Sequence, residues 1–246
     1  MSTKTEKGRS GCLTFLYNTD YETKLGGKCI SFDQEEENRT KNFLMRLIGV
    51  LMTVYNVVIG LSCFPAMTFV TWVTNWCLIF NMLFVMATMY LAKDWRTVSK
   101  GQLAALHIAF EVSGAFNLIV TCVHWTFVHS EVIDNFEGLA WTHMYTVHIF
   151  PQIAFLLNWR TMRLSLYSGH WKMFPPITAI YAYINYCEVK RLGKPLYWFL
   201  TWEDYTSPLI IAFITLCLAL FWVGMAKLTA SDASSVSPSK DGKKQK

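Results

Sequence analysis

The stretch from Leu139 to Trp159 reads LAWTHMYTVHIFPQIAFLLNW, which is an apolar run of about the 20 residues that a helix needs to cross a bilayer. It carries His143 and His148 at positions where a lipid-facing helix would hold leucine. Ionisable side chains at membrane depth are costly, so they usually face the interior of a helix bundle or a cavity. The stretch therefore predicts a helical membrane bundle with a buried polar pocket.

The composition of the whole chain agrees with a membrane protein. Of the 246 residues, 53% are hydrophobic and only 16% are charged, whereas ordinary soluble domains are about 25% charged. The net charge of +5 lies mostly in the polar ends and short connections, which suits a membrane surface and not nucleic acid. Seven cysteines are scattered without a CxxC pair or a zinc-finger spacing, so we expect neither a disulfide framework nor a metal finger.

The apolar segments predict an all-α, polytopic membrane bundle of about six transmembrane helices over residues 44–228. A polar cytoplasmic tail is expected over 1–43 and a flexible basic tail over 229–246. The expected spans lie near 44–64, 66–91, 103–128, 139–158, 173–191 and 207–227. The fifth is the least apolar, because Pro175-Pro176 opens it and Asn185 and Glu188 lie near its end. Five spans with a re-entrant segment there is the alternative.

The short loops predict the orientation. Lysine and arginine gather in 92–102 and 159–172, whereas 129–138 contains neither. The positive-inside rule then places both termini in the cytoplasm. The terminal Lys243-Lys244-Gln245-Lys246 resembles the dilysine signal that retrieval machinery of the endoplasmic reticulum reads. A basic tail lying beside acidic lipid headgroups explains it equally well.

Polar residues of the second and fourth expected spans define a candidate pocket. Thr71, Thr74 and Asn75 share one face of a continuous helix, at a depth of roughly 8–12 Å, and His143 and His148 lie at roughly 6–14 Å from the same side. A threonine hydroxyl becomes a nucleophile when a positioned base takes its proton, and Asn75 or a backbone amide could donate to the oxyanion that forms. The alternative is that these side chains only bind helices together.

Span three carries a second polar group. His107 and Glu111 are spaced i, i+4 and can form a charge-assisted hydrogen bond, so we assign them a pocket-tuning or structural role. His124 lies near the opposite end of the span, and His129 and His170 fall in or beside loops, where we expect them to be solvated. A haem or metal site in spans three and four is the less favoured alternative. We expect no cofactor and no metal. No GxSxG, HExxH, Walker or dinucleotide motif occurs in the chain.

Several stretches together resemble the androgen-induced protein family of multi-pass membrane threonine hydrolases and, more distantly, the rolling-stone family of membrane proteins. The resemblance covers about residues 66 to 225. Its stretches are Phe69-Val70-Thr71-Trp72, Phe110 to Trp125, Asp134-Asn135-Phe136, the histidine-bearing helix ending at Pro151, and Gly193 to Leu200.

The resemblance implies a hydrolase of fatty acid esters of hydroxy fatty acids, in the endoplasmic reticulum or plasma membrane, that needs no cofactor. It places Thr71 at the position of the nucleophile, with Thr74 as a competing match. The position of the family's histidine corresponds to Thr146 here, so the role of base passes to His148, with His143 as second choice. The expected partners are a lipid substrate and the membrane. The alternatives are a non-catalytic binding or scaffold protein and a haem-binding or transport protein.

Overall fold

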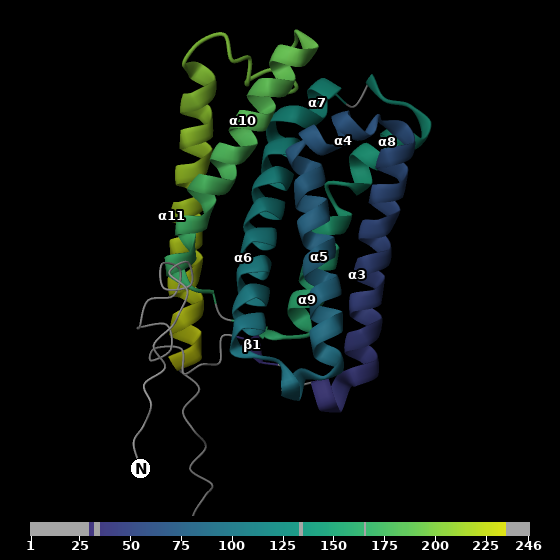
Figure 1. The fold of residues 1–246 in the computed structure, drawn as a ribbon, viewed down its shortest axis with the longest axis vertical. Coiled ribbons are helices and arrows are strands. Elements are labelled where there is room, and N and C mark those ends of the chain that lie inside the picture. Colours follow the sequence, from purple (N-terminus) through teal and green to yellow (C-terminus); the bar gives the residue numbers. More distant parts are fainter. Residues whose placement is uncertain (1–29, 32–34, 133–134, 165, 235–246) are drawn as a thin grey trace, which may run out of the picture.

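The structure of the chain is a computed structural model that describes residues 30–31, 35–132, 135–164 and 166–234. Within these ranges it is helical, apart from one pair of two-residue strands. Figure 1 shows α3, α5, α6 and α9 packed side by side, with α10 and α11 beside them. The described elements are β1 (Ile30–Ser31), α3 (Glu35–Cys63), α4 (Ala66–Thr71), α5 (Val73–Lys93), η1 (Trp95–Thr97), α6 (Lys100–Val123), η2 (His124–Val128), α7 (His129–Val132), α8 (Gly138–Thr146), α9 (Phe150–Arg160), β2 (Arg163–Leu164), η4 (Ser168–Met173), α10 (Phe174–Leu192) and α11 (Thr206–Ser234).

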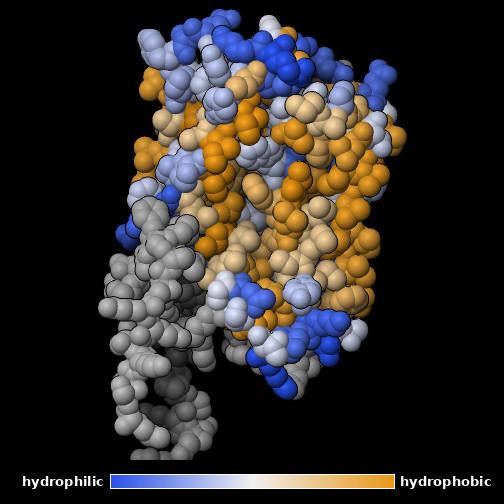
Figure 2. Space-filling model, viewed as in Figure 1, coloured by the Kyte–Doolittle hydropathy of each residue, from blue (hydrophilic) through white to orange (hydrophobic). Residues whose placement is uncertain are grey.

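Four helical segments are long and apolar enough to cross a membrane: Asn38–Cys63, Val73–Lys93, Gly101–Val128 and Thr206–Leu228. Many large apolar side chains on them are exposed; Leu51, for example, is 58% exposed and Leu220 is 64% exposed. Figure 2 shows this apolar surface as a band across the middle of the molecule, with hydrophilic residues at both ends. Contiguous apolar surface of this extent is typical of a face that contacts lipid. The prediction of a multi-span membrane protein is thus supported by four helices.

The fourth and fifth expected spans are not among these four segments. Residues 139–158 form α8 and α9, with an interruption at Val147–Ile149. Pro151 explains it, because proline has no N–H to donate to the carbonyl four residues earlier and its ring clashes with that carbonyl. Residues 173–191 correspond to α10, which is a continuous helix but is not among the four apolar segments.

The second expected span is also interrupted. Trp72 has an extended backbone, with φ −86° and ψ 125°, and separates α4 from α5. The Asn75 side-chain N–H donates to the carbonyl of Phe69 at 2.7 Å, and the Trp76 indole N–H donates to that of Val70 at 2.7 Å. These bonds satisfy carbonyls that the end of α4 leaves without helical partners, which stabilises the break.

Regular secondary structure extends into both segments that were expected to be tails. α3 begins at Glu35 and not near residue 44, and β1 within the expected tail pairs antiparallel with β2, so that Ile30 lies opposite Leu164. At the other end α11 continues to Ser234, past residue 229. The dilysine pair Lys243-Lys244 lies outside the described residues.

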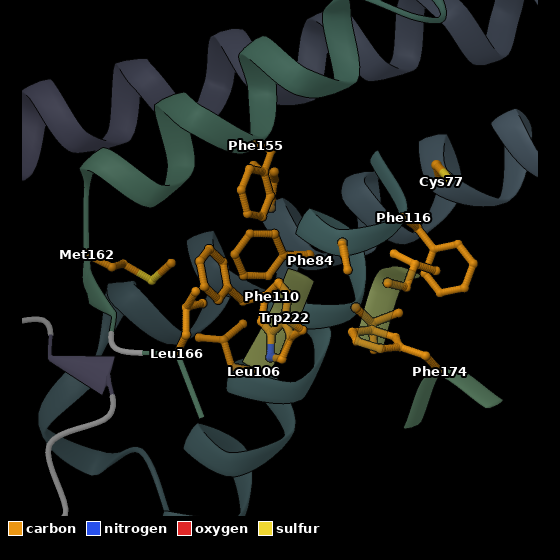
Figure 3. Close-up of a cluster of buried hydrophobic side chains, with 14 of the residues drawn as sticks. Cys77, Phe84, Leu106, Phe110, Phe116, Phe155, Met162, Leu166, Phe174 and Trp222 are labelled. Carbon is orange, nitrogen blue, oxygen red and sulfur yellow. The ribbon is translucent and has the colours of Figure 1, made fainter. Parts of the chain in front are cut away.

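The apolar core lies between α5, α6, α9 and α11 (Figure 3). The Phe110 and Phe155 rings stack with their centroids 5.0 Å apart, and the Phe84 ring lies 5.7 Å from Phe110. Phe155 fits this stack because α6 has Gly114 opposite it: a Cβ at that position would lie 2.5 Å from Phe155 Cζ. The packing of α9 against α6 therefore requires a residue without a side chain at position 114.

Buried polar side chains bond the same helices to one another. The Asn81 amide donates to the carbonyl of Pro151 at 3.0 Å, and the Asn158 amide donates to the Thr88 hydroxyl at 3.1 Å. Hydrogen bonds between membrane helices contribute about 0.6 kcal/mol on average. They link α5 to α9 on both sides of the aromatic core.

Candidate functional site

A largely apolar pocket opens between α5, α6, α10, α11 and the segment that follows α10. The enclosed part of this pocket has a volume of about 80 Å³. Its polar side chains are Thr74, His124, His148, Thr178, Tyr181 and Tyr197. An apolar pocket with a few convergent polar groups is the usual form of a small-molecule site. We call this pocket, defined by the residues above, the main pocket.

A smaller pocket, with an enclosed volume of about 20 Å³, lies on the other side of the Trp72 break, between α4, α5 and α8. It is lined by His143 and Asn75 among mainly apolar side chains. Trp72, Thr74 and His148 line both pockets, so they form the wall between the two. Thr74 and His148 thus both lie at the boundary between the two pockets.

His148 owes its position to the interruption between α8 and α9. Its backbone carbonyl accepts a hydrogen bond from the Thr121 hydroxyl of α6 at 3.3 Å. The side chain is 5% exposed, and its Nδ1 has no hydrogen-bond partner among the described residues. A neutral imidazole nitrogen without a hydrogen-bond partner can accept a proton from a group bound within its reach.

The His148 ring stacks on a second histidine. The His124 and His148 ring centroids are 3.4 Å apart, with an angle of 11° between the ring planes. His124 begins η2, a π-helical turn, and single π-helical turns occur often at functional sites. The stack fixes the plane of the His148 ring, and His124 also lines the main pocket.

The structure separates the two candidate threonines. Thr71 ends α4, and its hydroxyl donates to the carbonyl of Thr68 at 2.8 Å. It is 4% exposed and is not among the residues that line either pocket. Thr74 lies in the first turn of α5 and lines both pockets. Because the break at Trp72 changes the helix direction between them, the two side chains do not share one helix face.

Asn75 and His143 lie at the smaller pocket and not at the main pocket. One N–H of the Asn75 amide is engaged with Phe69, and its buried Oδ1, which is an acceptor, has no partner among the described residues. His143 lies in α8, 2% exposed, with its ring centroid 5.8 Å from that of Phe64. Both line the smaller pocket.

Tyr197 is a site residue that residue chemistry alone did not single out. Its ring is 8% exposed and lines the main pocket, and its phenol lies beside Thr74 and Tyr181. The phenol oxygen is buried and has no hydrogen bond of ordinary geometry within the described residues. A phenol O–H in that position can donate to a developing negative charge. In the sequence, Tyr197 stands out as part of the Gly193–Leu200 stretch that resembles the androgen-induced protein family.

His107 and Glu111 do not belong to this pocket. They lie in α6, and Glu111 is ten residues before Thr121, which bonds His148; ten residues of helix span about 15 Å. Glu111 instead contacts His170 of η4. The expectation that His170 is solvated is wrong, because its side chain is only 1% exposed. The group formed by His107, Glu111 and His170 is therefore a buried polar cluster separate from the main pocket.

Comparison with protein-family models, with curated proteins and with solved structures gives no match.

Proposed function

We propose that the chain is a membrane-embedded hydrolase of lipid acyl esters, such as fatty acid esters of hydroxy fatty acids. The single observation that carries the proposal is the shared position of Thr74 and His148 in the wall between the two pockets. The resemblance to the androgen-induced protein family supports the reaction type. Of the two threonines that it allows, the pocket favours Thr74 over Thr71.

The main pocket supports a lipid substrate. Most of its wall is aliphatic or aromatic, including Phe116, Val120 and Leu218. Burying an acyl chain against such a wall contributes roughly 0.8 kcal/mol for each CH₂ group removed from water. An acyl chain that entered this pocket would bring its ester carbonyl to the part of the wall that Thr74, His148 and Tyr197 line.

The chemistry assigns one role to each of these side chains. The Thr74 oxygen bonds to the ester carbonyl carbon while its proton passes to His148. Tyr197 donates a hydrogen bond to the carbonyl oxygen as it becomes negative. The intermediate then breaks the bond to the leaving alcohol, which takes the proton from His148. In the second half of the reaction, a water oxygen bonds to the carbonyl carbon of the acyl-threonine while its proton passes to His148. The bond between that carbon and the Thr74 oxygen then breaks, which releases the fatty acid, and Thr74 takes the proton back from His148.

The same proposal includes the arrangement in the membrane. α8 with α9, and α10, would supply the fourth and fifth of six crossings. The basic loops after α5 and α9 would face the cytoplasm, with both termini on that side and the protein in the endoplasmic reticulum. The pairing of β1 with β2 supports a common side for the N-terminal end and the loop after α9 (Figure 1).

Ester turnover by the detergent-purified full chain tests the proposal. The assay compares Thr74→Val, His148→Gln and Tyr197→Phe with Thr71→Val, using a branched fatty acid ester and a short chromogenic ester. We expect a loss of about 100-fold or more for Thr74→Val and His148→Gln, and of roughly the same order for Tyr197→Phe. Thr71→Val, which removes a hydroxyl bonded only within α4, should keep most of the turnover.

Two results would contradict the proposal. Loss of turnover in Thr71→Val with turnover retained in Thr74→Val would move the nucleophile to the end of α4. Absence of turnover in the folded wild-type protein would instead favour a non-catalytic binding or scaffold protein, in which these polar residues only pack helices.

A further inference from the structure

Three side chains with metal-binding atoms meet away from the main pocket. His107 and Glu111 lie one turn apart on α6, and His170 comes from η4, 59 residues after Glu111 in sequence. The His107 Nε2 atom lies 3.2 Å from one oxygen of Glu111, and the His170 Nδ1 atom contacts the other oxygen. The three ligating atoms lie within 4.8 Å of one another.

The loop before η4 contacts the Glu111 carboxylate through its backbone. The backbone N–H of Tyr167 donates to Glu111 Oε1 at 2.6 Å, and the His170 N–H donates to the Tyr167 carbonyl at 3.1 Å. The Tyr167 ring packs against the His170 ring, with centroids 4.9 Å apart. Gly169 allows this turn, since a Cβ there would lie 2.4 Å from the Tyr167 ring. His170 is therefore held toward α6 by several independent contacts.

The cluster is closed off from solvent. His107 is 0% exposed, and Glu111 and His170 are each 1% exposed. A carboxylate at this depth needs compensation, because removing a charge from water costs several kcal/mol. Neutral imidazoles offer hydrogen bonds to it, whereas a cation held by all three groups would offset the charge directly.

The donor set is that of a divalent transition metal. Two imidazole nitrogens and one carboxylate oxygen are ligands that Zn²⁺ and related ions accept, with bonds of about 2.0–2.2 Å. Two ligands of a tetrahedral ion at such bond lengths lie about 3.4 Å apart. The 3.2 Å between His107 and Glu111 is close to this spacing.

We propose that His107, Glu111 and His170 bind one zinc-class divalent ion that cross-links η4 to α6. The burial of all three ligands assigns the ion a structural role. The site lies about 15 Å along α6 from the carbonyl contact of His148, so it does not depend on the ester chemistry of the main pocket. Because η4 packs against α11, the cross-link would also fix the position of α11 relative to α6.

The test measures metal in the full chain, purified in detergent from cells grown with zinc and freed of loosely bound ions by dialysis. We expect about one zinc per chain by elemental analysis in the wild type. His170→Ala and Glu111→Gln should lose it, whereas His129→Ala, which changes a histidine outside the cluster, should retain it. Size-exclusion chromatography and circular dichroism confirm the fold of each variant.

A ligand exchange keeps the proposal testable if these variants do not fold. His107→Cys replaces one metal ligand with another, so its cobalt-substituted form should show a sulfur-to-cobalt charge-transfer band that the wild type lacks. Folded wild-type protein without stoichiometric zinc would overturn the proposal and leave the cluster as a hydrogen-bonded ion pair. Zinc retained in His170→Ala and Glu111→Gln, or a cobalt spectrum unchanged by His107→Cys, would overturn it as well.

Discussion

Gly114→Ala tests the packing of α9 against α6, the contact that holds the aromatic core together. A Cβ at position 114 would lie 2.5 Å from Phe155 Cζ and 3.0 Å from Cε2. The Phe155 ring must then move, which also disturbs its stack with Phe110. Overpacking costs about 2 kcal/mol and loss of the stack about 1 kcal/mol, while alanine gains about 1 kcal/mol over glycine in a helix.

The net loss of about 2 kcal/mol corresponds to a fall in Tm of roughly 4–8 °C for a chain of this size. Thermal unfolding in detergent, followed by intrinsic fluorescence, measures it. Gly101→Ala is the matched control on the same helix, because a Cβ there would meet nothing within 4 Å. It should leave Tm unchanged or raise it slightly.

A double-mutant cycle with Phe155→Leu isolates the contact itself. Leucine removes the ring that clashes, so Gly114→Ala should cost much less in the Phe155→Leu background. If Gly114→Ala unfolds at the same temperature as Gly101→Ala, or costs as much without the ring as with it, the assigned packing is wrong.

Two further substitutions test other contacts. Gly60→Ala places a Cβ 2.5 Å from Phe69 Cε2 and 2.8 Å from His143 Cε1, so we expect a loss of about 1–3 kcal/mol, measured as a lower Tm. Asn158→Leu removes the hydrogen bond to Thr88 and should cost about 0.5–2 kcal/mol in the same assay, with Thr88→Val in the Asn158→Leu background adding little more.

The main helices could be predicted from the sequence because lipid imposes a simple condition on them. A spanning segment must be apolar over about 20 residues and must satisfy its backbone hydrogen bonds internally. α5, α6 and α11 meet this condition, as does most of α3. Pro151 is a sequence signal for the break before α9, although residues 139–158 were expected to form one continuous span.

The break at Trp72 could not be predicted in the same way. No proline causes it; it depends on the side chains of Asn75 and Trp76, which bond carbonyls of the preceding helix. A helical wheel through this position places Thr71 and Thr74 on one face, whereas the structure turns only Thr74 toward the pockets. The choice between the two candidate nucleophiles therefore needed the structure.

His170 shows a second limit of the sequence. It lies outside the apolar spans, where a histidine is usually solvated, yet the turn at Gly169 and the Tyr167 amide direct it to Glu111. Contacts between residues so far apart in sequence depend on tertiary packing, which local patterns do not encode. No pattern among neighbouring residues in the sequence therefore predicts the contact between Glu111 and His170.

The most direct test of the proposed function is to locate the nucleophile by covalent labelling. The wild-type protein is treated with a fluorophosphonate probe, digested, and its modified peptide sequenced by mass spectrometry, beside Thr74→Val, Thr71→Val and His148→Gln. We predict an adduct on Thr74 that is retained in Thr71→Val and lost or strongly reduced in His148→Gln. An adduct on Thr71, or a wild type that hydrolyses esters while modified elsewhere, would contradict the assignment of Thr74 as the nucleophile.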